Sequence, residues 1–436
     1  MNLKDTVASA WQLPDLRARI IFLFAMFAVY SLGLHVPVPG LTPAQVDSFI
    51  GNNAMMGLID LFSGGALRKV SIFALGLNPY ITASIIMQLM SIAIPSLHQM
   101  QREGGDYAKR KINEYTRKLT VVLAILQGAG IAISILRSAG AATPFLTVSI
   151  LVISWTAGAM FLLWLGEQMT EKGIGNGISL LIFAGIVSRL PYYIGQTADF
   201  LRNGAVSPFG VTLLVVIFIG TIWSIVMFTR AQRRIPIQHA RRIIGQRAVG
   251  GQTTYLPLSL NSAGVIPIIF AISLLMLPQQ FANMVPQGGF LSTLLSNFAK
   301  WFTPGTSQLP LYYAWIPSFL YALMIFAFTY FYTAVIYNVE EIADNLKKHG
   351  AFIPGIRPGK PTQEYLDKVV TRVTAAGATF LAVIALLQYW VPDITGVSTF
   401  WLVGGTSMLI VVGVALDTMQ QIESQLLMRQ YEGFIK

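Results

Sequence analysis

The sequence predicts an all-α membrane protein of ten transmembrane helices, arranged as two inverted halves of five helices with a short re-entrant helix between the first two spans. Composition is the first reason. Of the 436 residues 54% are hydrophobic and 11% are charged, whereas soluble domains contain about 25% charged residues. The second reason is hydropathy, because ten apolar runs approach or exceed the roughly 18 residues that cross a bilayer core as a helix.

The ten predicted spans are residues 20–38, 72–94, 119–136, 145–166, 178–194, 211–229, 262–285, 315–337, 373–391 and 399–416. The first is interpreted as a retained span, because no small-residue cleavage site follows it and nine further spans do. Five spans fall in residues 1–205 and five in residues 206–436. An odd number of spans in each half inverts one half relative to the other. This symmetry rests on span number, since no residue-level repeat is visible.

The positions of Lys and Arg predict the orientation, because cytoplasmic loops are enriched in them. Of the 30 basic residues, 24 fall in the two tails and in the even-numbered connections, which share one side of the membrane. Both termini are therefore expected to be cytoplasmic.

Three basic connections are long enough to form surfaces: residues 98–118, 230–261 and 338–372. Anionic lipid headgroups often attract such clusters. The length of the last two connections favours docking of a large partner in addition to lipid contact, because topology alone needs only a few charges near helix ends.

Residue types that carry chemistry are scarce. The sequence has no cysteine, and its four histidines show no metal-ligand spacing. Ionisable side chains at membrane depth are usually functional, and the acids here are assigned to tails, loops and span ends. The fragment GIRPGKPT, residues 355–362, lacks the spacing and the Ser or Thr of a phosphate loop. We therefore expect no metal, no cofactor and no enzymatic activity.

Residues 57–70 (GLIDLFSGGALRKV) are too short to cross the membrane and too apolar for a solvated loop. They are typical of a re-entrant helix or of an interfacial amphipathic turn. Nearby aliphatic residues recur at helical spacing: Leu77, Ile81 and Ile85 in the second span, and Ile178 and Ile182 in the fifth. Spacing of this kind is usually a matter of packing.

Five motifs resemble the SecY family, the protein-conducting channels of the bacterial secretory translocon. They are FSGGALRKVSIFALGLNPYITASIIMQL (62–89), EQMTEKGIGNGISLLIFAGI (167–186), NSAGVIPIIFA (261–271), GAFIPGIRPGKPT (350–362) and GGTSMLIVVGVALD (404–417). The resemblance runs through both halves. It leaves out the connection at residues 287–309, to which we assign no function.

The resemblance implies a channel subunit that passes unfolded secretory polypeptides and releases membrane segments through a lateral gate. It implies an aliphatic pore ring of Leu77, Ile81, Ile85, Ile178, Ile182, Ile269 and Ile410. It implies a plug within residues 57–70 that includes Leu61, Phe62, Ser63, Gly64, Gly65, Ala66 and Leu67. The gate candidates are Gln88, Gln127 and Asn261, which could equally satisfy local backbone groups, and the docking candidates are Arg241, Arg242, Lys347, Lys348 and Arg357.

The resemblance also implies partners and a location. The partners are SecE-like and SecG-like small membrane subunits, the SecA motor ATPase, the ribosome, signal sequences, unfolded polypeptide clients and the lipid bilayer. No specific nucleic-acid recognition is expected beyond ribosome docking. The location is the bacterial inner membrane. An inverted-repeat secondary transporter of small solutes is the alternative, but it predicts charged residues within the membrane.

Overall fold

The computed structural model describes residues 11–52, 54–103, 105–140, 144–239, 242–244, 247–249, 253–285, 289–302, 313, 315–397 and 404–434. Each of the ten predicted spans overlaps a helix, and the all-α prediction is confirmed. The helices are α2 (Pro14–Gly33), α5 (Asn78–Ala93), α7 (Gly105–Ser138), α8 (Phe145–Lys172), α9 (Gly177–Arg202), α10 (Pro208–Arg230), α11 (Ile266–Met284), α13 (Trp315–Ile336), α15 (Lys360–Thr395) and α17 (Thr406–Phe434).

Seven of these helices are by themselves long and apolar enough to cross a membrane, namely α2, α7, α8, α9, α10, α13 and α15. In α11 the apolar stretch is shorter, and α5 has 16 residues. The predicted second span is helical only from Asn78, because residues 72–77 form turns. Pro79 explains this start, since the residue before a proline is disfavoured in the helical region and proline fits the first turn of a helix.

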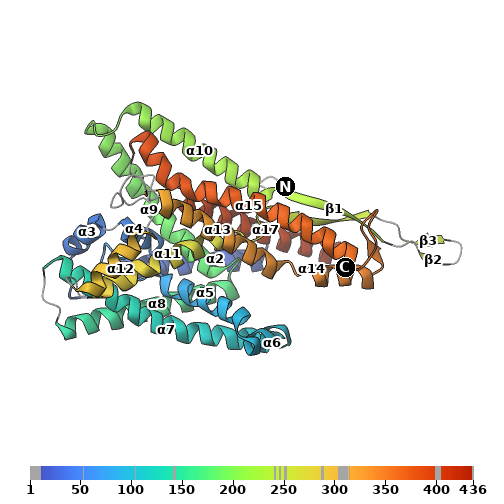
Figure 1. Ribbon diagram of the computed structural model, residues 1–436, viewed down its shortest axis with the longest axis horizontal. Helices are drawn as coiled ribbons and strands as arrows, with labels where there is room; N and C mark the ends of the chain where they lie inside the picture. The colour runs from blue at the N-terminus through green and yellow to red at the C-terminus, as the bar shows by residue number, and fades with distance from the viewer. Residues whose placement is uncertain are drawn as a thin grey trace.

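Short helices lie at both ends of the long ones (Figure 1). Toward the left end lie α3 (Pro43–Asn52), α4 (Ala54–Phe62) and α12 (Phe290–Lys300). Toward the right end lie α6 (Pro95–Glu103), α14 (Val339–Lys348) and the strands. The three long basic connections thus meet at one end, as the predicted orientation requires.

The connections expected at residues 230–261 and 338–372 form one folded unit. Strand β1 (Gln232–His239) pairs with β4 (Thr253–Ser259) of its own connection and with β5 (Ala351–Phe352) of the other, in the order β4-β1-β5. Strands β2 (Arg242–Ile244) and β3 (Arg247–Val249) form a separate hairpin, which projects beyond the helices in Figure 1. The unit has a small hydrophobic core of its own, made of Ile235, Leu258, Ile353 and Leu366.

The basic connection at residues 98–118 differs from the expected loop, because α6 and the first turns of α7 occupy it. Ion pairs at helical spacing accompany this extension: Lys109 with Asp106 at 3.9 Å and Lys118 with Glu114 at 2.6 Å. Pairs three or four residues apart face each other on a helix and support it. The basic surface here is therefore a helix that continues beyond the apolar part of α7.

The two predicted halves meet along two lines. On one side α11 packs against both α5 and α7, and on the other side α9 packs against α17 and α10. The predicted boundary near residue 205 falls in the turn between α9 and α10. The candidate functional site lies between these two contact lines.

Candidate functional site: a central constriction

A small apolar cavity lies where helices of both halves converge. Four helices each contribute isoleucine to its lining: Ile81 from α5, Ile182 from α9, Ile269 and Ile272 from α11, and Ile410 from α17. Phe62, the last residue of α4, completes this side of the lining. The cavity has a volume of about 10 Å³, which is near the lower limit for holding one water molecule. We call this site the constriction.

The remaining lining residues of the constriction are Asn78, Ser273 and Met276. Ile272 and Met276 follow Ile269 by three and seven residues and so share its helix face. No charged side chain lines the constriction. An aliphatic neck of this kind closes to water and ions by dewetting and needs no fixed charge.

Four of the seven expected ring residues line the constriction, and three do not. Ile178 lies nearer the start of α9 and packs against Gly166 of α8, where a Cβ would come within 2.9 Å of its Cγ1. Ile85 is buried one turn beyond Ile81, and Leu77 lies just before α5. These three residues do not line the constriction, and their place in the ring stays a prediction, because equal spacing along a helix does not mean equal depth.

The plug segment, residues 57–70, is helical only to Phe62 and continues as turns. Gly64 and Gly65 adopt φ values of 71° and 83°, a region that glycine enters without strain. The helix expected within residues 57–70 is therefore present but ends at Phe62. Leu61, Ala66 and Leu67 are fully buried, so the segment is part of the core and not an interfacial turn.

Hydrogen bonds fix the turn of the plug segment. The Tyr30 hydroxyl donates to the Ser63 carbonyl oxygen at 3.1 Å, and the Ser63 hydroxyl donates to the Asp60 carbonyl oxygen at 3.0 Å. These bonds place the turn directly after Phe62, which reaches the constriction. The plug segment is thus packed against the constriction.

A buried ion pair attaches the plug segment to α9. The Asp60 carboxylate accepts a hydrogen bond from Arg189 of α9 and lies 3.3 Å from Nε of Arg68. Burial raises the pKa of the Asp60 carboxyl, and the two guanidinium groups oppose that rise. The sequence argument missed this pair. An arginine inside the fifth predicted span and an aspartate inside an apolar segment were the available signal.

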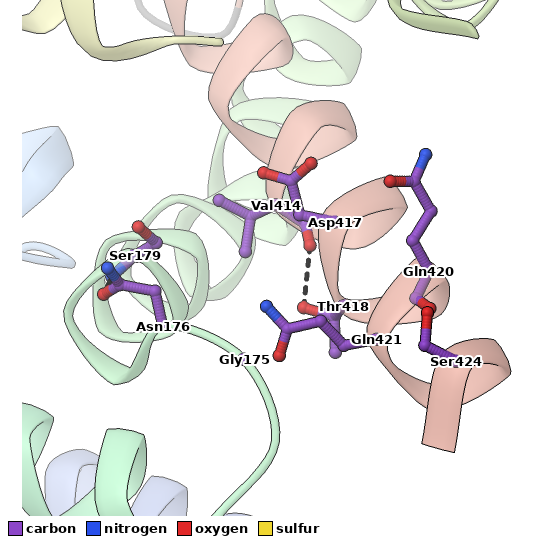
Figure 2. A pocket seen from close by; sticks show the side chains of 9 residues that line it. All are labelled: Gly175, Asn176, Ser179, Val414, Asp417, Thr418, Gln420, Gln421 and Ser424. Atoms are coloured by element: carbon purple, nitrogen blue, oxygen red, sulfur yellow. Dashed lines mark hydrogen bonds between the residues drawn. The ribbon is translucent and has the colours of Figure 1, made fainter. Parts of the chain in front are cut away.

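A larger polar pocket lies between the start of α9 and the middle of α17 (Figure 2). Its lining residues are Gly175, Asn176, Ser179, Val414, Asp417, Thr418, Gln420, Gln421 and Ser424. The volume of this pocket is about 300 Å³. Ser179 precedes Ile182 by one turn, and Val414 follows Ile410 by one turn. On both α9 and α17 the polar pocket is therefore one helical turn away from the apolar constriction.

Comparisons with known proteins agree with this geometry. Residues 71–419 match the SecY family. The chain is 42% identical to the protein translocase subunit SecY of Aquifex aeolicus, over 100% of both chains. It is 43% identical to the SecY subunit of Pseudomonas aeruginosa, over 97% of this chain and 94% of the relative.

The chain belongs to the SecY family. Its fold also matches solved structures, among them a protein-conducting channel with a TM-score of 0.68 at 19% identity, covering 94% of this chain and 92% of the other. The Sec61 channel of a canine ribosome complex matches with a TM-score of 0.63 at 16% identity, covering 94% and 92%. The predicted resemblance is confirmed, and the secondary-transporter alternative is not favoured. Within the described residues no His, Asp and Glu cluster is placed to hold a metal ion.

In this SecY chain the seam between α5 and α7 on one side and α11 and α13 on the other contains polar side chains. Tyr332 of α13 donates a hydrogen bond to the side-chain oxygen of Gln88 in α5. Gln127 is buried in α7, and Asn261 lies in the turn before α11. Neither the Gln127 Nε2 nor the Asn261 Oδ1 has a hydrogen-bond partner among the described residues. The three predicted gate residues are thus not bonded to one another.

Three docking candidates of this SecY chain lie on the folded unit of the connections at residues 230–261 and 338–372. Arg357 is exposed at the turn between β5 and α15, and Lys347 and Lys348 are exposed in the last turn of α14. Arg242 begins β2. Arg241 lies outside the described residues.

Proposed function

We propose that this chain is the central channel subunit of a protein translocase, which passes unfolded secretory polypeptides across the plasma membrane. The constriction carries the proposal. It is lined by five isoleucines from four helices, and the plug segment is packed against it. Flexible aliphatic side chains can yield around a polypeptide of any sequence, whereas a polar ring would bind some side chains and slow them.

Reconstituted complexes of this chain test the proposal. Proteoliposomes that contain the chain with its small membrane subunits, the motor and ATP should take up an unfolded secretory precursor and protect it from added protease. Empty liposomes are the control. If the complete complex protects no precursor, the chain is not a protein channel.

We further propose that the seam formed by α5, α7, α11 and α13 is the lateral gate between the two halves, residues 1–205 and 206–436. Gate helices must separate to release a membrane segment, so their polar contacts should be weak. Interhelical hydrogen bonds in membranes average about 0.6 kcal/mol, and the Gln88 to Tyr332 bond is of this type.

Chemical crosslinking tests this gate. The chain has no cysteine, so Gln88→Cys with Tyr332→Cys introduces one defined pair for a short bismaleimide. The crosslink should form in the resting complex and block signal-sequence insertion, because it ties α5 to α13. Gln88→Cys with Gly220→Cys on α10 is the control pair and should not crosslink. Full insertion through a crosslinked seam would contradict the assignment.

We propose that the folded unit of β1, β4, β5, α14 and the start of α15 docks the SecA motor and the ribosome. Exposed basic groups support this proposal. We also propose that the chain binds SecE-like and SecG-like subunits. An inner-membrane location with cytoplasmic termini agrees with the charge distribution along the chain.

Charge reversal at Arg357 should abolish motor-driven translocation while the protein still inserts and folds. The guanidinium stands in a turn stiffened by Pro354 and Pro358, so little conformational entropy is lost when a partner binds it. ATP-dependent precursor protection in proteoliposomes measures the effect. Lys109→Glu is the matched control, because Lys109 is an exposed basic residue on the α7 extension. Wild-type translocation by Arg357→Glu would refute the docking role.

A further inference from the structure

Three charged side chains meet where the plug segment touches α9. The Asp60 side chain is only 1% exposed, and Arg189 is 10% exposed. The same carboxylate also contacts Arg68, whose backbone N–H donates to Asp60 Oδ1 at 3.0 Å. Arg68 reaches Asp47 of α3 as well, at 3.6 Å. The cluster therefore joins the plug segment to two separate helices.

The Asp60 to Arg189 pair needs close backbone approach. A Cβ at Gly65 would overlap the guanidinium group of Arg189, so residue 65 has to be glycine for the arginine to reach Asp60. The Gly65 N–H also donates to the Asp60 carbonyl oxygen at 2.7 Å. The turn of the plug segment is thus folded around the ion pair.

Both residues of the ion pair lie close in sequence to residues that line the constriction. Asp60 precedes Phe62 by two residues, and Phe62 lines the constriction. Arg189 follows Ile182 by seven residues, which is two turns of α9 and about 10 Å along the helix axis. Each charged residue thus shares a helix with a residue that lines the constriction, so the pair joins the plug segment to the α9 wall of the constriction.

We propose that the Asp60 to Arg189 ion pair is a latch that sets the threshold a signal sequence must exceed to open the channel. The two residues would then be specificity determinants for clients, an inference that rests on the proposed function. In the closed state the charges are buried and each needs the other. In an open, water-filled pore each is hydrated and their attraction is screened. The latch therefore favours the closed and the fully open channel over a partly open one.

The test compares Asp60→Asn, Arg189→Gln and the double variant in the reconstituted complex. The precursors carry either a normal or a defective signal sequence. Each single variant should raise uptake of the defective precursor by about tenfold or more, because it removes the ion pair that joins the plug segment to α9 and leaves a buried charge with fewer partners. Uptake of the normal precursor should be unchanged. The double variant should exceed neither single variant by much, because both substitutions remove one interaction.

Two controls separate the latch from a general loss of structure. Arg202→Gln removes an exposed arginine from the same helix and should leave the threshold at its wild-type value. Gly65→Ala keeps both charges but pushes the guanidinium away, so it should lower the threshold as the charge variants do. Gly140→Ala matches its backbone strain, with φ of 64° and no atom near the added methyl, and should behave as wild type.

Two results would overturn the latch. One is wild-type rejection of the defective precursor by Arg189→Gln and Gly65→Ala alike, with normal uptake intact. The other is full additivity of the two single variants, which would mean that the residues act independently. Failure of the wild-type complex to take up the normal precursor would instead refute the proposed function.

Discussion

Replacing Ile81 and Ile410 with asparagine should make the resting channel conduct ions. Both side chains line the constriction from different halves of the protein. Asparagine is similar in size but offers hydrogen bonds to water, so the neck loses its dewetting barrier. Planar-bilayer recordings of the purified complex should show a severalfold rise in conductance. The Ile81→Leu, Ile410→Leu variant is the matched control and should stay closed.

Deletion of residues 57–70 distinguishes the constriction from the plug segment as the main barrier. We expect a smaller leak than in the double asparagine variant, because neighbouring apolar residues can fill part of the vacated space. A tight double asparagine variant together with a leaky deletion would contradict the assignment and make the plug segment the barrier.

Gly158→Ala should prevent the protein from accumulating in its folded form. A Cβ at Gly158 of α8 would overlap the backbone carbonyl of Ile72 and approach the Phe73 ring. Backbone cannot move aside as a flexible side chain can, so the substitution should cost about 1–3 kcal/mol or more. Detergent-solubilised protein should show a lower unfolding temperature and a loss of the monodisperse peak.

Gly220→Ala on α10 is the control for this packing effect. No atom lies within 4 Å of the added methyl, and alanine favours a helix interior by about 1 kcal/mol over glycine. The variant should be at least as stable as wild type. Equal behaviour of the two alanine variants would show that α8 does not depend on close contact with residues 72 and 73.

Much of the helical frame could be predicted from sequence, because hydropathy acts locally. Runs such as residues 145–166 and 211–229 have no other way to satisfy their backbone within a membrane than to form helices. Helix ends were harder. The start of α5 at Asn78 depends on Pro79 and the turns before it, and hydropathy does not distinguish a turn from a helix when both are apolar.

The constriction could be predicted only in part. Ile269 and Ile410 were identified through family motifs, since nothing in their local spacing distinguishes them from packing residues. Ile178 packs against Gly166 of α8 and does not line the constriction, so its place in the ring stays a prediction. Depth along a pore is a property of how helices are staggered, which a single sequence does not contain.

The buried ion pair lay beyond the sequence argument for a related reason. Asp60 and Arg189 are separated by 129 positions. Each is a charged residue within an apolar segment, but neither segment indicates the other as its partner. Their meeting depends on the return of α9 past the plug segment. The strands of the two long basic connections show the same limit, because β1 and β5 come from connections that are separated by α11 and α13.

The three-stranded sheet has a mechanical consequence. Strand β1 follows α10 after a single residue, and β5 lies eight residues ahead of α15. Since β1 bonds to β5 across the two connections, a pull on either one is shared between α10 and α15. A force applied to this sheet would therefore reach two helices of the C-terminal half together.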